Sequence, residues 1–311
     1  MKQILNCIFL ALTVFGFARG ARAQDDVLTP ELLQQAAELL ADNLDDDALD
    51  ALGVDKDRAH QFLAELQKRL QGSQVYDLAT LRTAAVQLQP LLASFEETQP
   101  YAVWLKAHLD YFEMSERLQR EALKQSTNTA RPLPSPSPET QRRAWTKLIE
   151  ERPAPVTTNK QVARLKQIFI EEKVPPQLVW LAEVESSFDA RARSPAGAAG
   201  LFQLMPATAR SLDLSVNLLR DDRLNAEKNA RAAARYLRYL HGRFKDWRLA
   251  LAAYNCGEGR VAGLLKKHRG QTYDDINQYL PTETQMYVPK FEATLRKHER
   301  IAMGDLKMPK A

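Results

Sequence analysis

A proline-rich stretch divides the chain into two parts of opposite charge. Residues 126–138 read STNTARPLPSPSP, and the four prolines of this polar segment exclude a continuous helix or a central strand. Residues 24–130 hold 9 Lys and Arg against 19 Asp and Glu, whereas residues 131–311 hold 31 against 20. We therefore expect two domains joined by this linker, an acidic one at 24–125 and a basic one at 139–311.

Helical periodicity runs through both parts. In the acidic part, Leu recurs at helical spacing in residues 29–44, which begin with Thr and Pro in the positions of an N-cap and a first helical residue, and again in residues 100–123. In the basic part, residues 226–244 place Ala and Leu on one face and arginines on another. No strand-like alternation interrupts these patterns. The sequence therefore predicts an all-α protein, whose acidic part is a helical packing or spacer domain.

The charge of each part has two interpretations. The basic part would suit an anionic polymer, or its arginines, such as Arg235, Arg238 and Arg243, form a solvated face. The acidic part would cover the basic part electrostatically, or its carboxylates are simply solvated. A nucleic-acid partner is not expected, because no recognisable binding motif accompanies the charge.

The first 23 residues have the pattern of a cleaved secretory signal peptide. Lys2 precedes an apolar run at residues 4–17, and Ala21, Arg22 and Ala23 form a small-x-small cleavage pattern. The apolar run is shorter than the roughly 20 residues of a membrane-spanning helix, and no later segment approaches that length. We therefore expect an exported protein, periplasmic or secreted, without a transmembrane segment. Cys256 is then the single cysteine of the mature chain, which excludes an internal disulfide.

Two glutamates lie two residues apart in the segment VPPQLVWLAEVESSF, residues 174–188. Pro175 and Pro176 are typical of a helix start. At about 3.6 residues per turn, Glu185 falls on the apolar stripe of this helix, and Glu183 projects about 200° away from it. A carboxyl group among apolar side chains has a raised pKa and can donate a proton near neutral pH. The alternative is a glutamate at the edge of an amphipathic face.

Glycines follow the glutamates in SPAGAAGLFQLMPATA, residues 194–209. Gly197 and Gly200 stand before a helix-like run, which indicates that the backbone approaches another backbone or a ligand closely there. The composition of this segment changes abruptly from that of the preceding helix.

Three blocks of the basic part, in order along the chain, resemble a known family. The first begins at Glu185 with ESSFDARARSPAGAAGLFQLMPATA, the second is AAYNCGEGRV at 252–261, and the third is LPTETQMYVPKF at 280–291. Together they resemble the catalytic domain of lytic transglycosylases of the soluble and membrane-bound D type, lysozyme-like enzymes that cut bacterial peptidoglycan. The resemblance covers residues 160–300 approximately.

The resemblance implies a goose-type lysozyme-like helical catalytic domain with Glu185 as its single catalytic acid. Glu185 would protonate the β-1,4 oxygen between N-acetylmuramic acid and N-acetylglucosamine and then act as base, giving 1,6-anhydro products without a metal or a cofactor. The residues implied to line or shape the cleft for the peptidoglycan glycan strand are Ser194, Gln203, Met205, Tyr254, Asn255, Glu283 and Tyr287. The acidic part lies outside the resemblance and is the candidate partner of cell-wall machinery.

Several of these residues also have a purely structural interpretation. Tyr254 would be a buried tyrosine with one satisfied hydroxyl, Met205 would fill the core, and Gln203 would lie at the surface or cap a helix. Glu283 would be a favourable charge in the first turn of a helix, where Thr282 begins a capping-box pattern.

Two other functions stay open from the sequence. Asp189 is the nearby candidate for a second carboxylate, as a hydrolytic muramidase of similar fold requires, although it also fits a residue that opens a loop. The other function is a non-catalytic wall-binding or assembly module. The chain departs from the family at Cys256, where alanine is usual, at Glu258, where proline is common, and in lacking an arginine two residues after the Glu-Thr pair of the third block.

Overall fold

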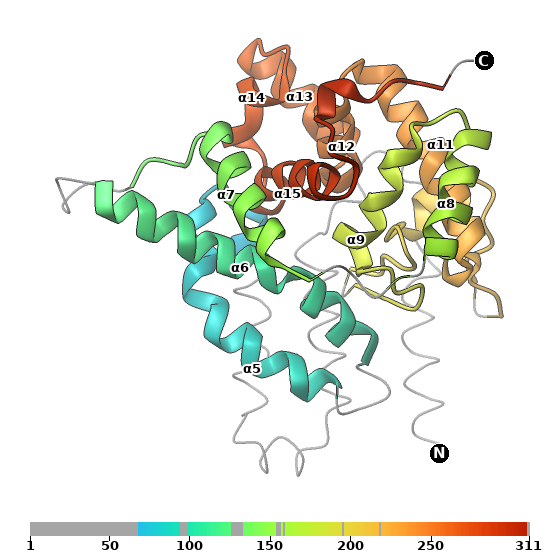
Figure 1. Ribbon diagram of the computed structural model, residues 1–311, viewed down its shortest axis with the longest axis horizontal. Helices are drawn as coiled ribbons and strands as arrows, with labels where there is room; N and C mark the ends of the chain where they lie inside the picture. The colour runs from blue at the N-terminus through green and yellow to red at the C-terminus, as the bar shows by residue number, and fades with distance from the viewer. Residues whose placement is uncertain are drawn as a thin grey trace.

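The computed structural model describes residues 68–93, 99–125, 133–153, 157, 159–194, 196–217 and 219–309. Within these residues the chain is built from helices, which confirms the all-α prediction for this part of the chain (Figure 1). Three isolated β-bridges occur in the loops around residues 193–221. The predicted signal peptide and the predicted helix at 29–44 lie outside the described residues.

The expected helices at 100–123 and 226–244 are both present, as α6 and α11. The α-helices are α5 (Arg82–Ala93), α6 (Gln99–Gln125), α7 (Pro138–Glu151), α8 (Asn159–Glu171), α9 (Leu181–Ser186), α10 (Pro206–Ser211), α11 (Ala226–Phe244), α12 (Trp247–Cys256), α13 (Glu258–His268), α14 (Tyr273–Ile276) and α15 (Thr282–Glu299). The 3-10 helices are η1 (Val75–Leu81), η2 (Pro176–Trp180), η3 (Asp222–Leu224), η4 (Asn277–Tyr279) and η5 (Met303–Asp305).

Side-chain caps define where the longer helices begin. The Ser137 hydroxyl accepts a hydrogen bond from the Thr140 backbone N–H, so α7 begins at Pro138, the last residue of the expected linker. Asn225 caps α11 through the Lys228 N–H, and Asp246 caps α12 through the Leu249 N–H. A polar side chain before each first turn satisfies a backbone donor that the helix itself cannot, which fixes these boundaries.

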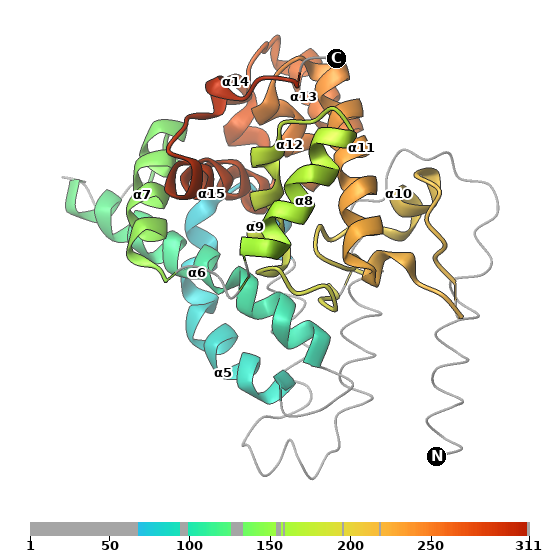
Figure 2. The same cartoon turned by 45° about the vertical axis from the view of Figure 1, so that its right-hand side comes forward.

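Two hydrophobic clusters form the core. One gathers side chains of α8, α9, α11 and α12, together with part of α15. The other joins η1, α5 and α6 to α7 and α15, with Trp145 and Met286 fully buried between them. Helix α15 packs along α7 and also against α12, so it belongs to both clusters (Figures 1 and 2).

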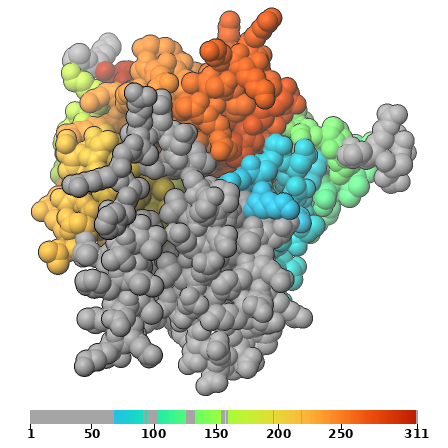
Figure 3. All heavy atoms as spheres, turned by 180° about the vertical axis from the view of Figure 1, so that it is seen from behind, coloured from blue at the N-terminus to red at the C-terminus, as the bar shows by residue number. Residues whose placement is uncertain are grey.

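The described residues of the acidic part therefore pack against helices of the basic part. In Figure 3 the surface of residues 68–93, in cyan, adjoins the orange surface of the later helices. The Gly72 carbonyl accepts hydrogen bonds from the Thr282 N–H at 2.6 Å and the Thr282 hydroxyl at 2.9 Å. The Gln285 amide donates to the Ser73 carbonyl at 2.9 Å. The division into two domains at residues 126–138 stays a prediction, since residues 24–67 lie outside the described part.

The same contacts correct the capping box expected at the start of α15. Pro281 is the N-cap of this helix and makes no side-chain cap. Thr282 instead binds the backbone of residue 72. The Thr282 hydroxyl therefore bonds to a carbonyl more than 200 residues away in sequence instead of capping its own helix. The local sequence pattern does not indicate such a distant partner.

Candidate active site

Glu185 and Glu183 have different surroundings on α9. The Glu185 residue is 9% exposed, while the Glu183 carboxylate lies 2.7 Å from His298 Nε2 at the C-terminal end of α15. The Trp180 ring stacks on the ring of the same His298, with ring centroids 3.7 Å apart. Glu185 therefore points into the protein, as the sequence analysis expected, and Glu183 ties α9 to α15.

The helix that carries both glutamates is shorter and less regular than expected. It begins at Pro176 as the 3-10 helix η2, continues as α9 and ends at Ser186. Ser187 and Phe188 have φ values of +53° and +64°, and their N–H groups bond to Glu183 and Ala182 carbonyls at 3.1 Å each. Phe188 is therefore not part of the helical stripe, although it is buried.

Tyr287, from the second turn of α15, reaches Glu185 directly. Its hydroxyl donates a hydrogen bond to Glu185 Oε1. Among the described residues no other hydrogen bond to the Glu185 side chain is present. The Tyr287 residue is 2% exposed, so this hydrogen bond is shielded from water. Tyr287, which we expected to shape the site, therefore contacts Glu185 itself.

Burial raises the pKa of Glu185 from its ordinary 4.5 to about 8. The Tyr287 hydroxyl opposes this rise because it stabilises the carboxylate. The Glu283 carboxyl raises the pKa further by like-charge repulsion, and the Lys290 ammonium lowers it. At neutral pH the balance leaves a proton on Glu185, which is the state that a general acid needs.

The segment at residues 192–204 follows α9 and forms a compact loop. At Gly200, φ is +85°, and a Cβ atom would lie 2.0 Å from the Arg223 carbonyl oxygen, so only glycine fits. The close backbone approach expected from the sequence is confirmed here. At Gly197 the positive φ of +86° is the requirement, because the nearest atom, in Pro206, would be 4.0 Å from a Cβ.

Two residues missed by the sequence analysis hold this loop. Asn229 of α11 accepts a hydrogen bond from the Phe202 N–H at 2.8 Å and donates to the Ala199 carbonyl at 3.2 Å. Arg223 of η3 donates to the Gly197 carbonyl at 2.6 Å and to the Leu204 carbonyl at 3.0 Å. Both side chains satisfy backbone groups that a loop cannot pair by itself.

The expected cleft residues of this loop are mainly engaged with its backbone. The Ser194 hydroxyl accepts from the Ala198 N–H at 3.0 Å. The Gln203 amide donates to the Gly200 carbonyl at 2.8 Å and to the Ala192 carbonyl at 3.0 Å, and its buried oxygen has no partner within the described residues. Met205 is the half-buried N-cap residue of α10. No hydrogen bond joins Ser194, Gln203 or Met205 to Glu185 in the part of the chain that is described.

Tyr254 and Asn255, at the end of α12, connect the loop and α15. The Tyr254 hydroxyl donates to the Phe202 carbonyl at 2.6 Å. The Asn255 amide donates to Glu283 Oε1 at 3.2 Å and accepts from the Thr284 hydroxyl at 2.6 Å. Helix α12 ends directly afterwards at Gly257, where φ is +89°. The second and third sequence blocks thus meet through side chains.

Asp189 and Cys256 have structural environments. The Asp189 carboxylate accepts from the Arg191 N–H at 2.8 Å, the contact of a residue that opens a loop. The Cys256 side chain is buried, and burial raises the pKa of its thiol to about 11. The thiol is therefore protonated at neutral pH and a poor nucleophile.

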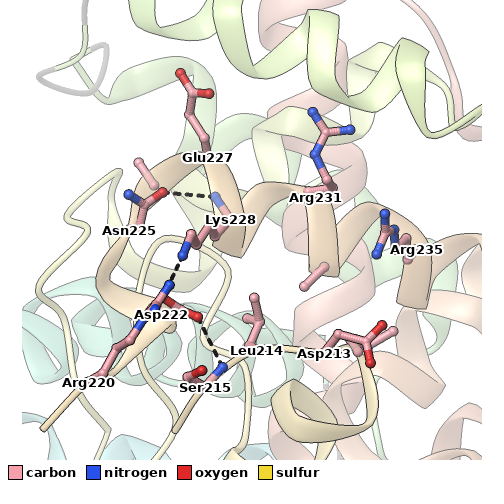
Figure 4. Close-up of a pocket in the computed structure, with 13 residues that line it drawn as sticks. Asp213, Leu214, Ser215, Arg220, Asp222, Asn225, Glu227, Lys228, Arg231 and Arg235 are labelled. Carbon is pink, nitrogen blue, oxygen red and sulfur yellow. Dashed lines mark hydrogen bonds and ion pairs between the residues drawn. The ribbon is translucent and has the colours of Figure 1, made fainter.

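A separate concavity of about 730 Å³ lies beside the N-terminal half of α11 (Figure 4). Its basic side chains are already paired: Arg220 and Lys228 both contact Asp222 at 2.8 Å, and Arg231 and Arg235 contact Glu172. Arg238 donates to the Glu172 carbonyl, and Arg243 contacts Glu258. The six basic side chains in these contacts share the four carboxylates of Asp222, Glu171, Glu172 and Glu258, so they are paired but keep an excess of positive charge, and both interpretations of the basic part stay open.

Known proteins are similar to this chain in the region that contains Glu185. The family model of the transglycosylase SLT domain matches residues 168–277. Membrane-bound lytic murein transglycosylase D of Escherichia coli K12 is 42% identical over 123 residues, which are 39% of this chain and 27% of that protein. A putative tributyltin chloride resistance protein of an Alteromonas strain is 35% identical over 116 residues, 37% of this chain and 56% of that protein. The chain therefore spans less than two thirds of these relatives.

A solved structure gives a weaker match. The alignment with the 70 kDa soluble lytic transglycosylase of Escherichia coli covers 88% of this chain and 46% of that transglycosylase, at 20% identity and a TM-score of 0.41.

The fold and site described above define a helical domain with one buried glutamic acid in contact with a tyrosine. The chain carries a transglycosylase SLT domain and is a homologue of the lytic murein transglycosylases. None of the described helices combines the length and apolar character needed to cross a bilayer.

Proposed function

We propose that this chain is an exported peptidoglycan lytic transglycosylase in which Glu185 is the one catalytic acid and base. The observation that carries the proposal is the buried Glu185 carboxyl, which contacts the Tyr287 hydroxyl and has its pKa raised to about 8. A proton held near neutral pH is what cleavage of a glycosidic bond requires of its acid. The SLT domain match and the expected signal peptide support the substrate and the export.

In the proposed reaction, Glu185 donates its proton to the β-1,4 oxygen between N-acetylmuramic acid and N-acetylglucosamine. The bond from C1 to that oxygen breaks, and an oxocarbenium-like centre forms at C1. The Glu185 carboxylate then removes the proton of the muramoyl 6-hydroxyl, whose oxygen bonds to C1. Glu185 is protonated again, the product is a 1,6-anhydro sugar, and no water is consumed.

Because the nucleophile belongs to the substrate, the site mainly has to align it. We assign that task to the loop at 192–204 and to Tyr254, Asn255 and Glu283, which are linked by the contacts described above. Asn255 holds Glu283 in place through its side-chain amide. The goose-type lysozyme-like architecture is part of the same proposal.

The variant Glu185→Gln tests the proposal. The amide cannot donate the proton, so we expect turnover of peptidoglycan sacculi to fall by roughly 10²–10⁴-fold. The matched control is Glu183→Gln, which alters the other glutamate of α9 and its contact with His298. The control should retain most of the turnover. Unchanged turnover in Glu185→Gln, or a larger loss in the control, would contradict the assignment.

A stability measurement separates loss of chemistry from loss of folding. Unfolded wild-type protein ionises Glu185 near its ordinary pKa, whereas the folded protein does so only near pH 8. The stabilisation from the neutral acid is present at low pH and is lost as the pH rises through the folded-state pKa. Gln carries no such pH dependence, so Glu185→Gln should unfold at or above the wild-type temperature at pH 8. A lower unfolding temperature would attribute the loss of turnover to misfolding.

A further inference from the structure

A row of three tyrosine rings leads from the proposed active site to the surface of α11. Tyr254 of α12 contacts Tyr236 of α11, with ring centroids 5.5 Å apart. Tyr236 lies beside Tyr239, with ring centroids 6.3 Å apart and ring planes inclined by 11°. Tyr254 and Tyr236 are half-buried, whereas Tyr239 is 51% exposed. The row therefore begins at a residue of the expected cleft and ends in solvent.

Tyr254 connects this row to the proposed site. Its hydroxyl donates to the Phe202 carbonyl of the loop at 192–204. Helix α12, which carries Tyr254, packs against α11 (Figure 2). Tyr236 and Tyr239 are three residues apart on α11 and share one face of that helix. Their rings are therefore continuous with the expected cleft and do not form a separate surface patch.

The exposed ring of Tyr239 is held in place through its hydroxyl group. This hydroxyl donates to Glu258 Oε1 at 3.1 Å and accepts from Arg243 Nη1 at 3.4 Å. Arg243 also donates to Glu258 Oε2 at 2.9 Å. Glu258 is the first residue of α13, at a position where the chain departs from the family. A ring that is already fixed loses little conformational entropy when a ligand binds to it.

The hydrophobic core does not account for Tyr239. Tyr236 and Tyr254 pack against one of the two hydrophobic clusters, but Tyr239 belongs to neither cluster of the described residues. Single exposed apolar side chains are common on protein surfaces and need no function. Tyr239 differs from them because its hydroxyl is bound and because two further rings join it to the site. This combination indicates a binding surface.

A flat aromatic ring with polar groups at its edge suits a sugar as ligand. A pyranose ring presents C–H groups on its faces, and the face of an aromatic ring carries the negative part of the ring quadrupole, so the two attract each other. The hydroxyl and acetamido groups at the edge of the sugar can bond to the Arg243 guanidinium and the Glu258 carboxylate beside the tyrosine. Ligand sites commonly combine apolar surface with a few polar groups in this way.

We propose that Tyr239, with Tyr236 beside it, extends the glycan site along α11 and stacks on a sugar of the strand away from the bond that is cleaved. The inference rests on the proposed function for the identity of that strand. A short oligosaccharide held at Glu185 does not reach Tyr239, so the ring favours long strands over short fragments. Binding energy that is equal in the bound substrate and in the transition state lowers KM without raising kcat.

Calorimetric binding of β-1,4-linked N-acetylglucosamine oligomers tests the inference without turnover. The full-length chain carries Glu185→Gln, so that no bond is cleaved, and the probes are the hexamer and the dimer. We expect Tyr239→Ala to weaken binding of the hexamer about tenfold and to leave binding of the dimer unchanged. Tyr239→Phe keeps the stacking surface and should retain most of the affinity.

Tyr279→Ala is the matched control. Tyr279 of η4 is 42% exposed and stacks on His268 with ring centroids 3.6 Å apart, outside the row of three rings. The control should bind both oligomers as the parent chain does. Equal hexamer affinity in Tyr239→Ala and the control overturns the inference. An equal loss for dimer and hexamer also overturns it, as does a parent chain that binds no hexamer.

Kinetics on soluble peptidoglycan strands separates failure of this inference from failure of the proposed function. With Glu185 intact, we expect Tyr239→Ala to raise KM about tenfold and to leave kcat unchanged. A lower kcat at unchanged KM overturns the inference, because the ring would then act on the chemistry. A wild-type chain without turnover would overturn the proposed function instead, and the oligomer titrations would still decide whether Tyr239 binds a glycan.

Discussion

The charge state of Glu185 results from neighbours that act in opposite directions. Burial and the Glu283 carboxyl raise its pKa, whereas the Tyr287 hydroxyl and the Lys290 ammonium lower it. The result, about 8, lies near the pH at which the group must both give and take a proton. A more deeply isolated acid would donate poorly, and a better stabilised carboxylate would hold no proton at neutral pH.

Replacement of Tyr287 by Phe tests this balance. The ring stays in the core, but the hydrogen bond to the Glu185 carboxylate is lost, which costs about 1.5 kcal/mol and raises the pKa of Glu185 by about one unit. Activity needs protonated Glu185, so the alkaline limb of kcat/KM should move to higher pH, with a lower maximal rate. Tyr76→Phe is the control, because the Tyr76 hydroxyl bonds to the Pro134 carbonyl. An unmoved limb in Tyr287→Phe contradicts this account.

At the residue scale, helical phase favoured the burial of Glu185 over that of Glu183, and Glu185 is buried even though the helix is partly 3-10 and ends at Ser186. The prediction succeeded because two residues of separation place side chains on different faces in either helical form. The contact of Glu183 with His298, the approach of His108 to Glu283 and the contact of Lys290 with Asp110 were beyond it. These partners lie more than 70 residues from the glutamate or carboxyl group that they meet, and no local pattern marks them.

At the scale of elements, the described residues of the loop at 192–204 are held by side chains of other elements. It contains isolated β-bridges in place of a strand or helix. Arg223 of η3 and Asn229 of α11 form hydrogen bonds with its backbone groups. The glycines of the loop were predictable, because close approach requires them. Their partners were not, because Asn229 and Arg223 look like ordinary polar residues of an amphipathic helix and its approach.

Substitution of Gly200 by Ala should show this constraint. The new Cβ would lie 2.0 Å from the Arg223 carbonyl and 2.7 Å from the Asn229 amide, at a φ of +85°. We expect a loss of more than about 2 kcal/mol in the free energy of unfolding, together with loss of turnover. Gly263→Ala is the control in α13, where nothing lies within 4 Å of the new atom. It should be neutral or stabilising by about 0.5–1 kcal/mol, and similar unfolding curves for both variants would count against the packing described here.

At the scale of the whole molecule, the opposite charges of the two sequence parts meet as specific ion pairs. Asp110 and Glu113 of α6 accept from Arg152, and Asp110 also binds Lys290. Lys297 of α15 donates to the Ile149 and Arg152 carbonyls at the end of α7. The sequence composition showed the charge difference between the two parts but not which residues form ion pairs. The described residues of α6 use it to dock onto α7 and α15, next to the site.

Asp110→Asn tests this docking. The substitution leaves Lys290 buried without its carboxylate, and removal of one partner of a buried ion pair costs about 3–5 kcal/mol. We expect a correspondingly lower free energy of unfolding by denaturant titration. Glu227→Gln breaks the exposed pair with Arg164, which is 2.7 Å long, and should leave stability unchanged. Wild-type stability in Asp110→Asn would show that α6 is not anchored through this pair.

We propose that Glu185 cleaves peptidoglycan with the muramoyl 6-hydroxyl as nucleophile. Mass spectrometry of sacculi digested by the wild-type chain in H₂¹⁸O tests it most directly. We expect 1,6-anhydromuramoyl ends without ¹⁸O, and we expect these ends to be absent from digests by Glu185→Gln. Reducing muramoyl ends that carry ¹⁸O would identify a hydrolytic muramidase, and sacculi left intact by the wild type would leave only a wall-binding role; either result contradicts the claim.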